Sequence, residues 1–137
     1  MKTRSQEDLS TAANLVGRVA TEKKEVRDIY GGLCHGFPVM VRTCGLCQAI
    51  MFSADKKTPT EDNEKAKNKA HKLLLEHVAE VLELNSVDNL LKKIREEDIS
   101  AYMLYTRRIL AAWIYFKRFA VSILDVPDAR SAQEDIT

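Results

Sequence analysis

The stretch that decides the fold of this 137-residue chain is residues 98–124, DISAYMLYTRRILAAWIYFKRFAVSIL, which contains no Gly or Pro. Its apolar side chains recur at alternating steps of three and four, a spacing that predicts one face of an α-helix. The members of that face are Ile99, Tyr102, Thr106, Ile109, Trp113, Phe116, Ala120 and Ile123. Because neighbouring positions are also apolar, we predict that this helix is the buried centre of a helical bundle. Trp113 lies at the middle of the face, and Asp98 or Ser100 supplies the N-cap.

A basic strip follows the remaining side of the same predicted helix. Arg107 and Arg118 are eleven residues apart, so they differ by only about 20° in direction and lie roughly 16 Å apart along the axis. Arg108 and Tyr115 border them. Two interpretations stay open: a solvated side on which the arginine stems lie along the helix, or a surface for nucleic acid or a protein partner.

Length and composition are those of one soluble globular domain. The chain is 45% hydrophobic and 30% charged, and its five Gly and three Pro are few, which favours long helices and short loops. No apolar run approaches the roughly 18 residues that a membrane span needs, and the polar start of the chain lacks the apolar segment of a signal peptide. Three cysteines do not make a disulfide framework. We therefore expect a cytoplasmic protein without membrane contact.

Charge is unevenly distributed along the chain. Residues 125–137 contain four acids and one base, a net charge of −3, and subtracting this from the whole-chain value of +1 leaves +4 on residues 1–124. We predict a helical domain over residues 1–124 and a disordered acidic tail over residues 125–137. A mildly basic body permits contact with phosphate but does not require it.

The predicted fold is all-α, a single bundle of about five helices, of which three are long, one is medium and one is short. The first helix is expected to begin at Ser5 and to end at one of the glycines between residues 31 and 36, where the left-handed conformation is available. Pro38 suits the first turn of a second helix. That helix is expected to continue through the apolar run to Phe52.

The third helix has the clearest start signal. Thr58-Pro59-Thr60-Glu61 has the order of a capping box with Pro in the first turn. We expect the helix to run to about Leu84, with His77 on its apolar seam as a hydrogen-bonded core histidine, and Ser86 to cap a short fourth helix. A face of the third helix continues the positive charge of Lys56 and Lys57 with Lys65, Lys69 and Lys72.

The common motifs of catalysis and nucleotide binding are missing from the sequence. It contains no P-loop, nucleophile elbow, dinucleotide-binding glycine pattern or HExxH. Most acids lie one turn from a base, as Glu61 does from Lys65, which is typical of surface pairing. We predict a protein that is not an enzyme and holds no cofactor.

Cys44-Gly45-Leu46-Cys47 is the one motif that suggests a metal or redox role. Zinc normally takes four ligands, usually from two such pairs, and a second pair is lacking. Because the second helix is predicted to run through the motif, we expect both thiols to lie mid-helix among apolar residues, buried, inert and free of metal. A metal or redox protein built on Cys44 and Cys47 is the less favoured alternative.

Two stretches of the sequence together resemble a known family. The first is residues 37–52, FPVMVRTCGLCQAIMF, followed by Lys56. The second consists of Tyr102-x-x-x-Thr106, Trp113 and Lys117-Arg118-Phe119-Ala120. In combination they resemble the small all-helical subunit of the type III-B CRISPR effector, the Cmr complex. Cys44 departs from the pattern, because that family commonly has Asn at this position.

The resemblance implies a non-catalytic building block of an RNA-guided, RNA-targeting complex. Such subunits stack into a filament beside the guide-RNA backbone subunits and help line the channel in which target RNA pairs with guide RNA. The implied partners are the other Cmr subunits, copies of the chain itself, and target RNA with guide RNA. The RNA-binding candidates that the resemblance implies are Arg42, Lys56, Arg107, Lys117 and Arg118. Arg108 joins them from its place beside the strip. The alternative is a helical protein-binding adaptor or regulator with no nucleic-acid contact.

Overall fold

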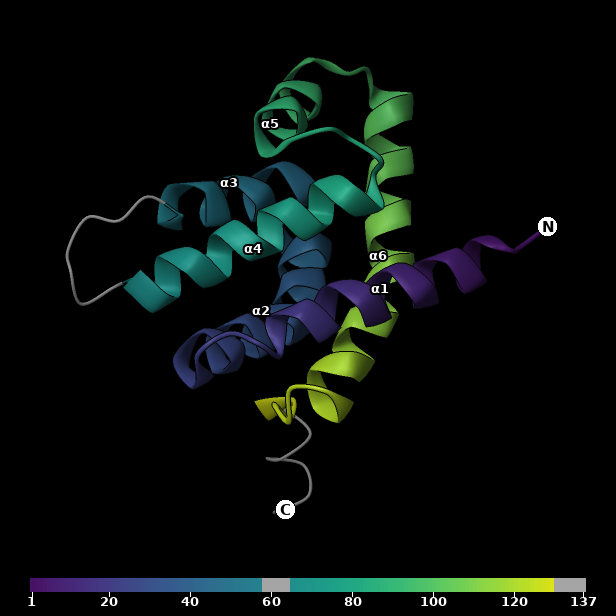
Figure 1. Cartoon of the computed structure of the whole chain (residues 1–137). Helices are drawn as coiled ribbons and strands as arrows, with labels where there is room; N and C mark the ends of the chain where they lie inside the picture. The colour runs from purple at the N-terminus through teal and green to yellow at the C-terminus, as the bar shows by residue number, and fades with distance from the viewer. Residues whose placement is uncertain (58–64, 130–137) are drawn as a thin grey trace.

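The computed structural model describes residues 1–57 and 65–129, and these ranges contain six α-helices and no strand. The helices are α1 (Arg4–Val19), α2 (Lys24–Cys44), α3 (Leu46–Lys56), α4 (Lys65–Val81), α5 (Val87–Glu96) and α6 (Ile99–Ser122) (Figure 1). The all-α prediction is confirmed, with six helices in place of about five. No helix of the described ranges is long and apolar enough to cross a membrane.

A single core joins the helices. α2 packs against α3, α4 and α6, while α1 packs mainly against α6 and crosses in front of it in Figure 1. The largest fully buried side chains are Trp113, Tyr30 and Phe116. They come from α2 and α6, which shows that these two helices supply the centre of the core.

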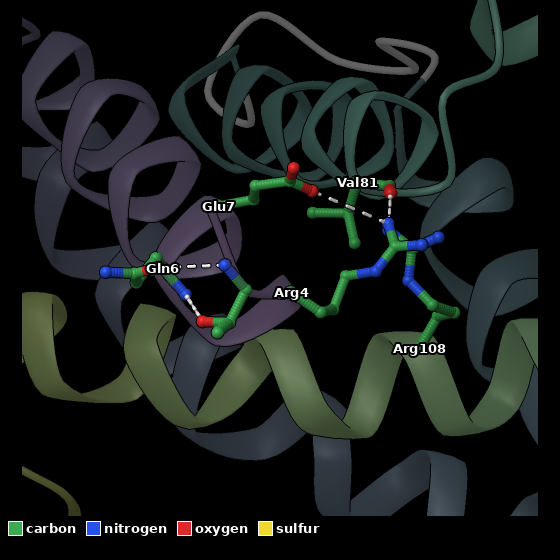
Figure 2. Close-up of polar contacts among 6 residues, drawn as sticks. Arg4, Gln6, Glu7, Val81 and Arg108 are labelled. Atoms are coloured by element: carbon green, nitrogen blue, oxygen red, sulfur yellow. Dashed lines mark hydrogen bonds and ion pairs between the residues drawn. The ribbon is translucent and has the colours of Figure 1, made fainter. Parts of the chain in front are cut away.

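The first helix boundary differs from the predicted one. Thr3, and not Ser5, is the N-cap of α1: its hydroxyl accepts from the Gln6 N–H at 3.2 Å, and the Gln6 side chain accepts from the Thr3 N–H at 2.8 Å (Figure 2). α1 ends at Val19, and α2 then runs through the glycines between residues 31 and 36. The prediction that one of these glycines ends a helix is wrong, because burial of the apolar side of α2 offsets the roughly 1 kcal/mol that each interior Gly costs.

Gly31 leaves space in α2 for a distant segment, because Val126, which follows α6 in the chain, packs directly against it. A Cβ at Gly31 would lie 2.6 Å from Val126 Cβ, whereas a Cβ at Gly32 would meet nothing within 4 Å. We expect Gly31→Ala to lower the free energy of unfolding by about 1–3 kcal/mol through overpacking. The matched Gly32→Ala should raise it by up to about 1 kcal/mol. Urea denaturation of the two variants measures both values, and equal effects would contradict the close approach.

The second predicted helix is also divided differently. Pro38 lies inside α2 and not in a first turn, and its ring has no N–H for the helical hydrogen bond. The break falls at Gly45, whose φ of 89° is left-handed and suits Gly. The Gly45 N–H donates to Val41 O at 2.9 Å and closes α2, and Gly45 O accepts from the Ala49 N–H at 3.1 Å and opens α3. The predicted continuous helix to Phe52 is therefore two helices.

α6 follows the predicted stretch, and Asp98 caps it by accepting from the Ala101 N–H at 3.0 Å. Ile109, Trp113, Phe116 and Ala120 of the predicted face are buried, as is Ala112 beside them. Ile99 and Ile123, at the two ends of the predicted face, are exposed, so the prediction holds for the middle of the helix and is wrong at its ends. α1, α2 and α4 pack against α6, and the side opposite these buried residues is exposed. The exposed large apolar residues of α6 are Ile99, Met103, Leu104, Ile114 and Val121.

The described part of the tail, residues 125–129, lies against α2 and α6. His35 Nε2 is 2.8 Å from Val126 O, and Asp128 Oδ2 is 3.6 Å from Lys117 Nζ. The domain boundary at 124 and the disorder of the tail stay predictions. The predicted capping box at residues 58–61 and the tail residues 130–137 lie outside the described residues.

Candidate interaction surfaces

The six predicted RNA-binding residues do not form one surface. Arg107, Arg108, Lys117 and Arg118 lie on α6, at one side of the molecule in Figure 1. Lys56 ends α3, at the opposite side. Arg42 lies near the end of α2 and is exposed; it follows Gly31, His35 and Pro38 at steps of four, three and four, which places it on the same side of that helix.

Arg108 and Lys117 have partners within the chain. Arg108 Nη2 donates to Val81 O at 2.7 Å and fastens α6 to the end of α4 (Figure 2). Lys117 pairs with Asp128 and fastens the start of the tail. Arg108 also faces Asp8, where burial raises the pKa of the carboxyl against the opposing charges of Arg108 and Arg4. These contacts give both residues a structural use that the sequence did not predict.

The outer face of α6 mixes arginine with exposed apolar side chains. Arg107 and Arg118 are both exposed, and neither has an ion pair or hydrogen bond with the described residues. Ile114, between them, is 61% exposed. No acid occurs anywhere in α6. We use "outer face of α6" for Ser100, Met103, Leu104, Arg107, Ala111, Ile114, Arg118 and Val121.

A lysine-rich end forms where α3 meets α4. Asn68 of α4 donates to Lys56 O at the end of α3, and His71 Nδ1 lies 3.0 Å from Ser53 Oγ. These bonds hold the two helix ends together around a hollow of about 490 Å³, lined in part by Lys57 and Lys72. We use "lysine-rich end" for Lys56, Lys57, Lys65, Lys67, Lys69 and Lys72.

The positive potential of the lysine-rich end acts on a buried histidine. The pKa of His71 is lowered from 6.5 to about 4, mainly by burial and further by the charges of Lys67 and Lys56. Lys56 Nζ lies 5.8 Å from the centre of the Phe52 ring, which is 39% exposed. Lys69 is paired with Glu22 at 2.8 Å. The lysine-rich end thus has cations beside an exposed aromatic ring.

The opposite end of α4 is acidic, and the sequence analysis missed it. Glu76 and Glu80 are one turn apart on the same side of α4, and Glu83 follows in the turn after the helix ends, with φ of 60°. All three are exposed and line a hollow of about 470 Å³, and Leu84 and Val87 also line it. The signal was present in the sequence as a helical spacing of like charges. We use "acidic end" for Glu76, Glu80 and Glu83.

The cysteine prediction is corrected by the break at Gly45. Cys44 ends α2, Cys47 lies in the first turn of α3, and both are exposed instead of buried mid-helix. The Cys47 N–H donates to Tyr102 Oη at 3.0 Å, which ties α3 to α6. Cys34 is the buried cysteine, and burial raises the pKa of its thiol to about 12. Within the described ranges, no group of three or more His, Cys, Asp or Glu residues could hold a metal ion.

His77 is a core histidine, as predicted. It is 5% exposed, and its Nδ1 shares a hydrogen bond with Tyr30 Oη. Burial, with a smaller contribution from the charge of Arg18, lowers its pKa from 6.5 to about 4. His77 therefore belongs to the core and not to either charged surface.

Comparison with known proteins assigns the chain to a family. The model of a family described as CRISPR-associated protein (Cas_Cmr5) matches residues 4–123. The chain belongs to the Cmr5 family. The match spans all six helices, so the resemblance seen in residues 37–52 and in α6 is confirmed over nearly the whole fold.

The sequence of one relative and a solved structure both agree with the Cmr5 assignment. The chain is 34% identical over 125 residues to the CRISPR system Cmr subunit Cmr5 of Thermus thermophilus, a match that covers 91% of this chain and 99% of that protein. The X-ray crystal structure of a Cmr5 family protein from the same organism superposes with a TM-score of 0.74 at 32% identity. That superposition covers 89% of this chain and 98% of the other. Sequence and fold thus agree on the same family.

Proposed function

We propose that this Cmr5 family chain is a non-catalytic small subunit of a CRISPR Cmr effector complex. In this proposal it contacts other Cmr subunits, stacks with copies of itself, and helps line the channel for target RNA. The family match and the Cmr subunit among the relatives support the assignment to the complex. The observation that supports RNA contact is the lysine-rich end, where one open hollow is lined by Lys57, Lys65, Lys69 and Lys72, with Glu76 as its one acid among the described residues.

Phosphate contact suits the lysine-rich end for physical reasons. Lys57 and Lys72 line the hollow, and Lys56 lies beside it with its ammonium over the Phe52 ring. Flexible ammonium groups bind phosphate as point charges, and an exposed ring gives an unpaired base a surface for stacking. No base-specific contact is needed, because the guide strand reads the sequence. Lys56, one of the six RNA-binding candidates, belongs to this lysine-rich end.

The test is a double charge reversal, Lys56→Glu with Lys72→Glu, in the reconstituted effector complex. Each phosphate contact with a single strand contributes about 0.7 to the slope of log affinity against log salt, so two lost contacts should reduce the slope by about 1.4. We expect weaker capture of target RNA at low salt and a smaller loss of capture as salt is raised. Filter binding of labelled target RNA at several salt concentrations measures both.

The matched control reverses two exposed lysines elsewhere, Lys2→Glu with Lys92→Glu, for the same change in net charge. If the control lowers the slope as much as the test pair, the effect belongs to net charge and the lysine-rich end has no special role. If neither pair changes the slope while both variants assemble, the lysine-rich end does not contact RNA.

A second candidate function, a protein-binding adaptor without RNA contact, draws on a different observation. The outer face of α6 carries exposed Ile114, Met103 and Leu104 beside its arginines, and apolar side chains suit a protein contact better than a phosphate backbone. An unchanged RNA capture by the Lys56 and Lys72 variant, in a complex that needs the chain for assembly, would favour this candidate.

A further inference from the structure

We propose that the start of the tail is an autoinhibitory strap, in which Asp128 fills an anion site formed by His35 and Lys117 until a phosphate group of RNA takes its place. We use "strap" for residues 125–128. This inference rests on the proposed function and deepens it, because it adds a second site for RNA and a competitor for that site within the same chain.

The strap is held in a fixed position by the fold. The chain turns at Asp125, whose φ of 59° is left-handed, a conformation that Asp tolerates better than most residues. After the turn, Val126 packs into the space at Gly31 of α2. Val126 O also lies 2.8 Å from His35 Nε2, and the ring nitrogen is the donor because a carbonyl oxygen only accepts. These contacts place Asp128 between α2 and α6.

Two basic side chains from different helices converge on one oxygen of Asp128. Lys117 Nζ of α6 lies 3.6 Å from Asp128 Oδ2, and His35 Nδ1 of α2 lies 3.9 Å from the same atom. His35 is only 8% exposed, and its Nδ1 has no hydrogen-bond partner in the described structure. A buried ring nitrogen and an ammonium group that face one point form an anion site, and Asp128 is the anion that the chain itself supplies.

A phosphate group can replace Asp128 because the ion pair with Lys117 is weak. The Lys117 side chain is 37% exposed and that of Asp128 is 23% exposed, and water screens pairs that are open to this degree. A phosphodiester carries the same single negative charge as the carboxylate, and an ammonium group binds either as a point charge. Lys117 can therefore exchange one anion for the other without a change in the helices.

The charges along α2 favour an RNA strand over a free phosphate ion. Arg42 is exposed and follows His35 by seven residues on the same side of the helix, about 10 Å further along the axis. Asp28 precedes His35 by seven residues and repels phosphate from the other direction. A strand that binds at Lys117 thus finds a second cation towards Arg42, whereas a single ion reaches Lys117 alone.

The experiment compares Asp128→Asn with Asp125→Asn in the full chain. Each variant loses one negative charge, and Asn suits the left-handed φ at Asp125, so circular dichroism should show that both fold. We expect Asp128→Asn to bind labelled single-stranded RNA about two- to five-fold more tightly than wild type at low salt. Its slope of log affinity against log salt should steepen by up to about 0.7, for one added phosphate contact. Asp125→Asn, the control for net charge, should give less than half of that gain. Fluorescence anisotropy at several salt concentrations measures both quantities.

The Lys117→Gln background supplies the decisive comparison. There Asp128→Asn should gain no more affinity than Asp125→Asn does, because the cation that Asp128 covers is absent. A gain that persists without Lys117 overturns the proposal, as do equal gains from the two Asn variants in the presence of Lys117. Weaker RNA binding by Asp128→Asn also overturns it, and so does an Asp128→Asn chain that binds no RNA at the highest soluble concentration.

The strap and the lysine-rich end are tested separately. The salt slope of the Lys56 and Lys72 variant in the effector complex decides the role of the lysine-rich end, and neither residue belongs to the strap. The expected result for the strap with an unchanged slope in the complex would keep RNA contact at Lys117 and remove it from the lysine-rich end. A reduced slope in the complex with equal gains from the two Asn variants would leave the proposed function standing and overturn the strap alone.

Discussion

Replacing Trp113 with Ala is expected to lower the free energy of unfolding by about 3–5 kcal/mol, the range for a large aromatic side chain in a packed core. Trp113 is fully buried, its ring is stacked on Phe116 with centroids 4.1 Å apart, and the Phe37 ring lies 5.1 Å away. Truncation removes contacts with α2 and α6 at once and leaves a cavity that the neighbouring helices cannot fill. Chemical denaturation followed by circular dichroism measures the loss.

Ile114→Ala is the matched control, since it changes the next residue of the same helix. Ile114 is 61% exposed, so its truncation should change stability by less than about 0.5 kcal/mol. Trp113→Phe should cost less than Trp113→Ala, because it keeps most of the ring area and removes an indole N–H that has no hydrogen-bond partner in the described structure. Equal losses for Trp113→Ala and Ile114→Ala would contradict the orientation of α6.

Acidification is expected to lower the free energy of unfolding, and this is the second large effect. The pKa values of His71 and His77 are each lowered from 6.5 to about 4 in the folded chain. The unfolded chain therefore binds protons first, so the stability that these histidines contribute is complete above pH 6.5 and falls as the pH drops towards 4. For His77, which is the more deeply enclosed of the two, a full shift of this size corresponds to about 3 kcal/mol, whereas solvent screening makes the contribution of His71 smaller. Asp8, whose pKa burial raises, acts in the opposite direction and reduces the total.

His77→Gln separates the contribution of the buried histidine from the rest. Glutamine cannot take up the proton, so the variant should lose at least half of the histidine-dependent decrease between pH 6.5 and 4, while its stability at pH 7 falls through poorer packing. Urea denaturation of wild type and variant at pH 7.0, 6.0, 5.0 and 4.5 gives, for each protein, the slope of the free energy of unfolding against pH. Parallel slopes would show that His77 is not held neutral by its burial beside Tyr30.

The sequence alone determined the class of the fold and the inner side of its last helix. Apolar spacing of three and four, carried by residues such as Ile109, Trp113 and Phe116, is a local property, because helix geometry fixes which side chains share a side. The N-caps Asp98 and Ser86 are local as well, since a cap needs only its own first turn. The family resemblance in residues 37–52 and in α6 likewise needed no structure.

Helix boundaries inside apolar segments were decided by the tertiary structure. Glycine permits both a helix interior and a left-handed turn, so the sequence could not say that Gly31 continues α2 and Gly45 ends it. Packing makes the choice: Val126 needs the space at Gly31, and the turn at Gly45 brings the Cys47 N–H to Tyr102. The exposure of Cys44 and Cys47 follows from that turn.

The tertiary structure also decided which charged residues have partners within the chain and which stay exposed. Arg107 and Arg108 are adjacent in sequence, yet Arg108 reaches Val81 at the end of α4 while Arg107 stays exposed. The sequence showed an apolar and basic helix, but not which side its neighbours cover, because that depends on where α1, α2 and α4 lie. Charge and period are local properties of a chain, whereas a free surface is what remains after distant segments have packed.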